Sequence, residues 1–378
     1  MPAFSSDERQ LLHDSLRDYF GTKYAFERYR ELSRPEHADG FGRTEWQDYA
    51  DLGWLGVALP ESVGGSSGGA TELGIVMATA GAALALEPLL ATVALGANAI
   101  SLAGTPDQQA QLTDIVAGNH TLAFCHAEFD SGYTRDFVTT HAQSDDDSFV
   151  LNGRKAFALH AHAADTLLVS ARVNRGDGPV ALFLVPSDSS GLELHGAPAL
   201  DGRRGAAVIL ENVRVPADMR LGKSDRDSIA IIDAVIDRGV LALCAEAAGA
   251  MAAVTEQTIE YLKAREQFGQ PLSKFQVLQH RLVDMNVAAE EARAVTHAAL
   301  RASDQEASDA QEKIWKAKVK TAKSARFVGG QAIQLHGGMG MTDELAIGHY
   351  YKRLTMCETM FGDAEWYLQK LAERESGL

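Results

Sequence analysis

Cysteine is scarce in this sequence, which excludes stabilisation of the fold by a set of disulfides or by a zinc cluster. The three cysteines, Cys125, Cys244 and Cys357, lie far apart along the 378 residues. Such spacing supports neither a disulfide framework nor a zinc cluster, and it is typical of a protein from a reducing compartment. We therefore expect a cytoplasmic protein without a bound metal.

Positive charge is also in short supply. The chain has 35 Lys and Arg residues against 51 Asp and Glu residues, which gives a formal net charge of −16. Sequence-independent binding of nucleic acid requires a basic surface that displaces counterions, so this acidic composition argues against it. With 46% apolar and 23% charged residues, the composition is that of an ordinary globular chain.

Long uninterrupted apolar runs are missing as well. The most apolar stretch, residues 75–104, is divided at Glu87-Pro88 into pieces shorter than the ~18 residues that a membrane span requires. No membrane span is predicted, and the many Ala and Gly residues of this stretch favour buried, closely packed helices. The first ten residues, MPAFSSDERQ, lack the basic and apolar regions of a secretory signal.

The spacing of apolar residues changes twice along the chain and predicts three segments. Residues 1–120 have helical spacing, with a capping-box pattern at Ser5 and Glu8 before a helix that continues to Gly21, and a second helix expected over 44–52. The helical period returns over residues 223–378. There we expect helices at residues 227–265, 276–302, 307–336, 343–352 and 363–374.

Residues 121–222 instead contain short runs rich in β-branched and aromatic residues. We expect strands over residues 121–125, 137–142, 148–151, 166–172, 180–185 and 206–210. Asn152-Gly153 is a typical two-residue hairpin turn. The regular spacing of these runs predicts a small antiparallel barrel or sandwich, so the fold class is α+β and mostly helical.

Two familiar motifs lack the context that their chemistry needs. GGSSG at residues 64–68 matches the nucleophile pattern G-x-S-x-G, but Pro60 and glycines precede it where a strand is required, which favours a surface loop. No G-x-G-x-x-G follows a predicted strand and no P-loop is present, so nicotinamide binding and phosphoryl transfer lose support. His160 and His162 have no carboxylate or thiol at ligand spacing, and we expect a surface pair rather than a metal site.

Three other features are candidates for a functional site. Residues 265–272, REQFGQPL, place a guanidinium beside an aromatic ring at a helix end, which suits a phosphate and a stacked ring, or is an ordinary helix terminus. Residues 334–340, QLHGGMG, contain glycines that let backbone N–H groups approach an anion, or form a simple helix cap and turn. Asp237-Arg238 lies within an apolar helix, where a carboxylate must be paired or perturbed, and a structural contact is the alternative.

These features occur in this order behind a helical–β–helical layout, and on them the chain resembles the acyl-CoA dehydrogenases. The resemblance extends to residues 104–118, to NGRK at 152–155 and to VRVPADMRLG at 213–222, and it is most specific at 265–285 and 334–340. It implies an N-terminal helical domain over residues 1–120, a middle antiparallel β domain over 121–222 and a C-terminal four-helix domain over 223–378. FAD would lie between the last two domains and across a subunit contact.

The resemblance also implies roles for particular residues. Arg265 and Phe268 would hold the pyrophosphate region of FAD, together with Gln334 and Gly338 of the partner subunit. The isoalloxazine would be lined by Phe124, Cys125 and His126 and by the run Phe157–Leu159. The implied reaction is α,β-dehydrogenation of an acyl-CoA thioester, in which a carboxylate removes the α-proton and a hydride passes from Cβ to flavin N5. An electron-transfer flavoprotein would then accept the electrons.

The chain departs from the family where the base is expected. The usual base is a Glu after an aromatic residue near the C-terminus, and Gly362 stands at that position in FGDAEW, residues 361–366. Asp363 is one residue off, so we expect it to point elsewhere. Leu159 replaces the threonine that often lies near flavin N5, and EFDSGY at 128–133 replaces an acidic loop with Pro and Gly. Restoring Glu at residue 362 is expected to restore or enhance activity.

A second base position exists in isovaleryl-CoA dehydrogenase-like members, immediately before an arginine on the long helix. Asp237-Arg238 falls there, so Asp237 is the candidate base, with Arg238 and the backbone N–H of Gly362 as candidate contacts to the substrate. The departures resemble the small-subunit type of pimeloyl-CoA dehydrogenase and related mixed-subunit enzymes.

The expected protein is thus an FAD-dependent acyl-CoA dehydrogenase that forms a homotetramer or a mixed tetramer with a second acyl-CoA dehydrogenase subunit. Two alternatives stay open: a non-catalytic subunit that completes a partner's site, and a related flavin oxidase or monooxygenase. The sequence does not determine whether the acyl group is pimeloyl, straight-chain, branched or a steroid side chain.

Overall fold

The structure is a computed structural model that describes residues 4–174, 176, 178–222 and 228–376. Its residues form two compact units. The first comprises Met1–Glu31, Gly69–Ala85 and Val240–Leu378, and the second comprises Leu32–Gly68 and Leu86–Gly239. Residues 223–227, where the predicted third segment and its first helix begin, lie outside the described residues.

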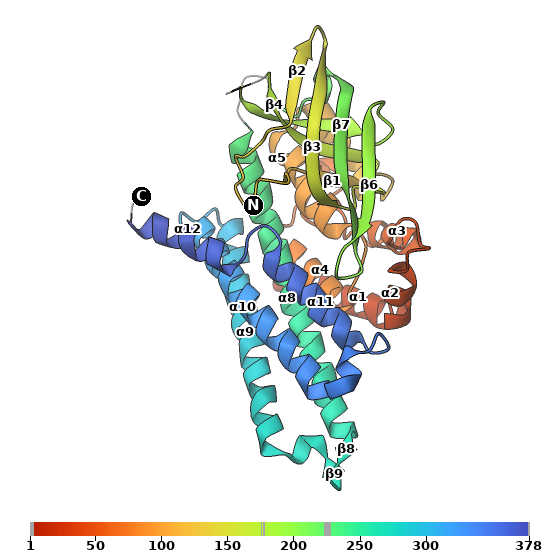
Figure 1. Cartoon of the computed structure of the whole chain (residues 1–378), viewed down its shortest axis with the longest axis vertical. Coiled ribbons are helices and arrows are strands. Elements are labelled where there is room, and N and C mark those ends of the chain that lie inside the picture. Colours follow the sequence, from red (N-terminus) through yellow and green to blue (C-terminus); the bar gives the residue numbers. More distant parts are fainter. Residues whose placement is uncertain (1–3, 175, 177, 223–227, 377–378) are drawn as a thin grey trace. The chain divides into compact units, whose positions relative to one another are not determined.

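The first unit is helical (Figure 1). It contains α1 (Ser6–Lys23), most of α2 (Phe26–Leu32), α4 (Ala70–Ala82), most of α8 (Ile229–Ala264), α9 (Gln276–Asp304), α10 (Ala310–His336), α11 (Ala346–Thr359) and α12 (Ala364–Ser376). Short elements between them are β8 (Glu266–Gln267), β9 (Gln270–Pro271), η4 (Leu272–Lys274) and η5 (Gly337–Met341). The capping box is confirmed, because the Ser5 N–H donates to Glu8 at 2.7 Å and the Glu8 N–H donates to Ser5 Oγ at 3.3 Å.

Close helix packing holds this unit together, as the small residues predict. A Cβ atom at Gly81 of α4 would stand 2.2 Å from the carbonyl oxygen of Glu246 on α8, so the backbones meet directly. Arg353 of α11 donates to Glu246 Oε1 at 2.7 Å, and both side chains are almost completely buried. A buried charge is tolerated only with such a partner, so this ion pair specifies how α11 lies on α8.

The second unit contains the first part of α8, and the helices that lie wholly within it are short. They are α3 (Arg43–Asp51), η1 (Glu61–Val63), the π-helix η2 (Leu89–Ala97), α5 (Asn98–Ala103), α6 (Pro106–Ala110), α7 (Leu112–Val116) and η3 (Ala217–Met219). All nine residues of η2 are buried, which agrees with the apolar character of the stretch that contains it. Within the described part of the chain, no helix combines the length and the apolarity needed to cross a membrane.

The second unit also contains a seven-stranded sheet (Figure 1). Its strands are β1 (Leu122–Cys125), β2 (His141–Asp145), β3 (Ser148–Leu159), β4 (Thr166–Val173), β5 (Val180–Pro186), β6 (Leu192–Pro198) and β7 (Arg204–Pro216). They follow the order β1-β4-β2-β3-β7-β6, with β5 paired to β4. The predicted β domain is confirmed with one correction: β1 and β2 both pair with β4 in parallel, while the other pairs are antiparallel.

The predicted turn at Asn152-Gly153 is wrong, because β3 continues through it. The turn before β3 lies at Asp146 instead, with a φ of +50°. Gly153 has a φ of +150° and falls at an irregularity in the pairing of β3 with β7. Its freedom serves a bulge, at which a Cβ atom would stand 2.6 Å from Thr140 Oγ1.

Candidate functional site

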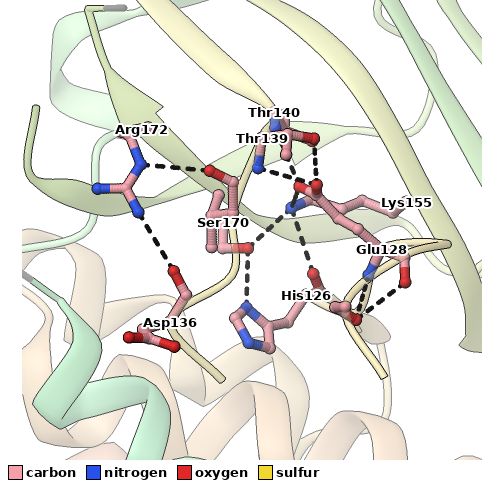
Figure 2. A network of polar contacts seen from close by, with 10 residues as sticks. His126, Glu128, Asp136, Thr139, Thr140, Lys155, Ser170 and Arg172 are labelled. Carbon is pink, nitrogen blue, oxygen red and sulfur yellow. Dashed lines mark hydrogen bonds and ion pairs between the residues drawn. The ribbon is translucent and has the colours of Figure 1, made fainter. Parts of the chain in front are cut away.

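A buried polar network joins three strands of the sheet (Figure 2). Lys155 of β3 donates from Nζ to Glu128 Oε1 at 2.7 Å, to Ser170 Oγ of β4 at 3.0 Å and to the carbonyl oxygen of His126, just beyond β1, at 3.3 Å. His126 Nδ1 lies 2.9 Å from the same Ser170 Oγ. Every member is buried, so these contacts replace the water that the polar groups give up on folding.

The protonation states follow from this burial. Burial opposes ionisation of Glu128, but the Lys155 ammonium and hydrogen bonds outweigh it and lower the pKa of Glu128 to about 2. Burial and the nearby Lys155 charge lower the pKa of His126 to about 3, so its ring is neutral at neutral pH. Because Ser170 Oγ accepts from Lys155, its hydroxyl can donate to His126 Nδ1, and the other ring nitrogen is then the donor to the backbone of Arg135.

Glu128 also explains why a predicted strand begins late. The N–H groups of Thr139 and Thr140 donate to its carboxylate at 2.9 and 3.0 Å, and Arg172 Nε donates to the carbonyl oxygen of Val138 at 3.2 Å. The N–H groups of Thr139 and Thr140 are therefore bonded to a buried carboxylate, and the first backbone bond to β4 is from the Arg172 N–H to the Thr140 carbonyl oxygen at 2.8 Å. The strand predicted over 137–142 accordingly begins at His141.

The two runs expected to line the isoalloxazine are joined in this unit. The Ala156 N–H donates to the carbonyl oxygen of Ala127 at 2.8 Å, which ties β3 to the segment after β1. The rings of Phe124 and His126 stack at 5.9 Å with an interplanar angle of 29°. Phe157 is 40% exposed, and its ring lies so close to Gly205 that a Cβ atom there would stand 2.7 Å from it.

Two of these expected flavin contacts have restricted surroundings. Cys125 is completely buried in the core of the sheet, where burial raises the pKa of its thiol to about 12, so the thiol stays protonated and does not face solvent. Leu159, at the end of β3, is 8% exposed.

Asp237 is paired with an arginine that sequence reasoning missed. Arg135, on the segment after β1, donates from Nη2 to Asp237 Oδ1 at 2.9 Å and from Nη1 to Asp233 Oδ1 at 3.2 Å. The side chains of Arg135 and Asp237 are each 12% exposed. Arg238 follows on α8 and is half-buried. No local pattern could have indicated Arg135, because it lies 102 residues before Asp237 in the chain.

The residues expected to contact the FAD pyrophosphate lie at helix ends of the first unit. Arg265 directly follows α8 and is exposed, and Phe268, in the hairpin between β8 and β9, is 90% exposed with a φ of +56°. Gln334, near the end of α10, and Gly338, in η5, are exposed. The rings of Tyr261 and His336 stack at 4.2 Å and bring the ends of α8 and α10 together.

The Gly362 position is shaped by its own packing. Lys318 of α10 is buried and donates to the carbonyl oxygens of Cys357 and Glu358 at the end of α11, and burial lowers the pKa of this lysine. Tyr367 of α12 donates to the carbonyl oxygen of Phe361 at 2.8 Å. Gly362 has a φ of +115°, and a Cβ atom would stand 2.7 Å from the Tyr367 ring. The expectation that Glu would restore a base here is therefore opposed by strain and by lack of space.

The two histidines near the end of β3 are not a surface pair. His160 is 3% exposed, and His162 Nε2 lies 2.9 Å from the carbonyl oxygen of Asp39. Burial lowers the pKa of His162, which keeps it neutral. Among the described residues, no three His, Cys, Asp or Glu side chains are grouped as a metal site would require.

Comparison with known proteins identifies the family. Models of the N-terminal, middle and C-terminal domains of acyl-CoA dehydrogenase match residues 6–119, 123–213 and 229–375. The chain is 30% identical over 370 residues, 95% of either protein, to the probable acyl-CoA dehydrogenase YngJ of Bacillus subtilis. Among solved structures it resembles a variant of the steroid ACAD Tcur3481-Tcur3483, with 30% identity, a TM-score of 0.88 and 98% coverage of both chains. Butyryl-CoA dehydrogenase of Megasphaera elsdenii has 26% identity and a TM-score of 0.88 over all of both chains.

The chain belongs to the acyl-CoA dehydrogenase family. It is therefore an oxidoreductase of the flavin-dependent acyl-CoA dehydrogenase type, and the family's cofactor is FAD. The resemblance noted in the sequence and the fold of helical, β and helical domains are confirmed.

Proposed function

We propose that the protein dehydrogenates an acyl-CoA thioester between Cα and Cβ, with Asp237 as the base. The observation that carries the assignment of the base is the place of its partner in the chain: Asp237 binds Arg135, which lies shortly after β1. Arg135 lies on the segment that directly continues from the residues proposed to line the flavin, so one short stretch links them to the carboxylate. The expectation that Asp237 is paired on a mostly apolar helix agrees with this contact.

The chemistry assigns separate tasks to the chain's own residues. Asp237 takes the α-proton of the thioester, the electrons of the broken C–H bond pass towards the new double bond, and the thioester oxygen needs hydrogen-bond donors while its charge develops. The Gly362 N–H is our candidate donor, and Arg238 is a candidate substrate contact. When bound, FAD supplies N5 as the acceptor of the hydride from Cβ.

The residues present fit this cofactor. The half-exposed Phe157 and the stacked rings of Phe124 and His126 offer flat surfaces to a planar ring. Arg265 offers a guanidinium for a diphosphate, and a Cβ atom at Gly338 would meet no atom of its own chain, so packing does not require glycine there. We propose that Gln334 and Gly338 act on the cofactor of the partner subunit.

Partners follow from the same assignment. The chain is 26% identical, over 92% of its length, to the caffeyl-CoA reductase-Etf complex subunit CarC of Acetobacterium woodii, which supports an electron-transfer flavoprotein as acceptor. Exposed Val277, Val283 and Val287 on α9 support a tetramer, either homomeric or mixed with a second acyl-CoA dehydrogenase subunit of the pimeloyl-CoA type. A cytoplasmic location stays a prediction.

The test combines cofactor stoichiometry with a substrate panel. Purified protein is expected to hold FAD and to lose flavin absorbance when mixed anaerobically with one of a series of pimeloyl, straight-chain, branched and steroid acyl-CoA thioesters.

Asp237→Asn should retain FAD but reduce it about 10²- to 10⁴-fold more slowly, because the shape of the side chain is nearly kept and the proton acceptor is lost. Asp145→Asn is the matched control, because Asp145 pairs with the exposed Arg214 away from this site. Reduction at the wild-type rate in Asp237→Asn would refute this base, and rapid oxygen consumption would indicate an oxidase.

A second function is favoured by the packing at Gly362. Because the usual base position has no room for a side chain, the chain fits a subunit that completes a partner's site without turning over substrate itself. This function predicts that protein purified alone never reduces its flavin with any thioester, whereas a co-purified complex with a second acyl-CoA dehydrogenase does.

A further inference from the structure

The segment between β1 and β2 is fastened at several points to the buried network (Figure 2). Its beginning is held by Glu128, whose carboxylate binds Lys155 and the N–H groups of Thr139 and Thr140 at its end. Its middle is held by Arg172, which donates from Nη2 to the carbonyl oxygen of Asp136 at 3.2 Å. A loop with this many bonds to buried groups has few conformations open to it, so the residue at its centre is placed accurately.

That central residue is Arg135. Its backbone binds the neutral His126 ring, and its guanidinium lies between two carboxylates one helical turn apart on α8. Asp233 and Asp237 differ in exposure, since the side chain of Asp233 is 41% exposed and that of Asp237 is 12% exposed. The guanidinium therefore binds one carboxylate that is open to solvent and one that is nearly enclosed.

We propose that Arg135 is the positioning residue of the base: it holds the Asp237 carboxylate in a fixed orientation for the α-proton. This inference rests on the function proposed above. Arg135 donates to Oδ1 of Asp237, so the contact orients the carboxylate that receives the proton.

Asp233 has a distinct part in this arrangement. When the proton moves from the substrate Cα to Asp237, the carboxylate loses its charge and its attraction for the guanidinium weakens. Asp233 binds the other side of Arg135, so the guanidinium keeps a partner and stays where it is. Asp237 then releases the proton to solvent, which restores its ion pair with Arg135.

The experiment separates the base from its positioning residue. The probe is an acyl-CoA thioester with α-hydrogens but no β-hydrogen, 3,3-dimethylbutyryl-CoA, whose α-protons exchange with deuterated water without any hydride transfer. Exchange on the FAD-loaded protein is followed by NMR for the wild type and for Arg135→Gln, Arg135→Lys and Asp237→Asn. Arg214→Ala is the matched control, because Arg214 pairs with Asp145 on the exposed surface of the sheet. FAD content and urea unfolding are measured for each variant.

Arg135→Gln is expected to slow exchange about 10- to 10²-fold at saturating 3,3-dimethylbutyryl-CoA, with little change in KM, since misplacing a reacting group costs this much. Arg135→Lys, which retains the charge, should recover most of the rate. In the Asp237→Asn background, Arg135→Gln should cause no further loss, because the group on which it acts is gone.

Three outcomes decide the matter. Wild-type exchange in Arg135→Gln would overturn the positioning role while leaving Asp237 as the base. An equal loss from Arg135→Gln in both backgrounds would also overturn it, because Arg135 would then act independently of Asp237. Undiminished exchange in Asp237→Asn would instead refute the proposed base itself, so the two failures are distinguishable.

Discussion

Gly362 lies against the ring of Tyr367 without room for a side chain between them. A Cβ atom at residue 362 would stand 2.7 Å from Cε2 of Tyr367 and 2.9 Å from Cε3 of Trp366. Tyr367 is completely buried and donates to the carbonyl oxygen of Phe361, so its ring is not free to move aside. Glycine at this position is therefore part of the local packing, and the carboxylate cannot be restored by a single substitution.

We expect Gly362→Glu to destabilise the protein by about 2–4 kcal/mol, because it combines a strained φ with overpacking. The substitution should not increase flavin reduction by acyl-CoA. Urea unfolding measures the first effect and anaerobic stopped-flow absorbance the second. Gly330→Ala on α10 is the control, since a Cβ atom there meets no neighbouring atom. Faster reduction together with unchanged stability would contradict the packing argument.

Arg265→Ala should weaken the retention of FAD while leaving the fold intact. The side chain is exposed and its charge-assisted bonds to a phosphate are worth ~1.5–3 kcal/mol, which corresponds to roughly 10- to 10²-fold in affinity. Gln334→Ala should act in the same direction but less, because a neutral donor is lost. Lys263→Ala removes a neighbouring exposed cation that pairs with Glu260 and serves as control. FAD titration followed by fluorescence measures the affinity, and wild-type affinity in both Arg265→Ala and Gln334→Ala would disprove the assignment.

Local patterns predicted most elements of the fold, because helix caps and periodicities are properties of neighbouring residues. The capping box at Ser5 and the runs of β3 and β4 are of this kind. Strand β6 was missed because half of it faces solvent and its sequence, LELHGAP, lacks an apolar run. The turn predicted at Asn152-Gly153 was wrong because the backbone freedom of glycine suits a turn and a bulge equally.

The sequence identified Asp237 of the candidate site but not its partner Arg135. Asp237 could be singled out because a carboxylate on an apolar helix needs a partner, but the sequence does not identify the cation with which it pairs. The answer, Arg135, depends on how residues 128–140 are tied to Glu128 and Lys155, and these bonds exist only in the folded sheet. Long-range pairing of this kind cannot be read from spacing along the chain.

Lys155→Met should be among the most destabilising substitutions in the β unit. It removes the cation from Glu128 and leaves a buried carboxylate, which costs about 3–5 kcal/mol. The double variant Lys155→Met with Glu128→Gln should recover part of that loss, because the uncompensated charge is gone. By contrast, Arg214→Ala breaks an exposed ion pair and should cost at most about 1 kcal/mol. A double-mutant cycle in urea measures the coupling, and additive effects of the two substitutions would rule it out.

Glu87 should make the stability of the second unit depend on pH near neutrality. Its carboxyl group is buried, accepts from the Gly42 N–H at 3.1 Å and accepts from the Tyr49 hydroxyl at 3.0 Å. Burial raises the pKa of Glu87 from 4.5 to about 7, with a further contribution from the negative charge of Glu45. The folded state therefore favours the neutral acid, and it binds this proton more tightly than the unfolded chain does.

The sign of the effect follows from linkage. The stabilisation is fully present below pH 4.5, where both states are protonated, and it is lost as the pH rises from there through about 7. The difference of 7 − 4.5 corresponds to about 3 kcal/mol of unfolding free energy. Glu87→Gln keeps the shape and hydrogen bonds of the neutral acid, so its unfolding free energy should lack this fall and exceed that of the wild type at about pH 8. Urea unfolding at several pH values tests this, with the exposed Glu61→Gln as control. A wild-type–variant difference that does not change between about pH 5 and 8 would show that Glu87 is already ionised in the folded protein.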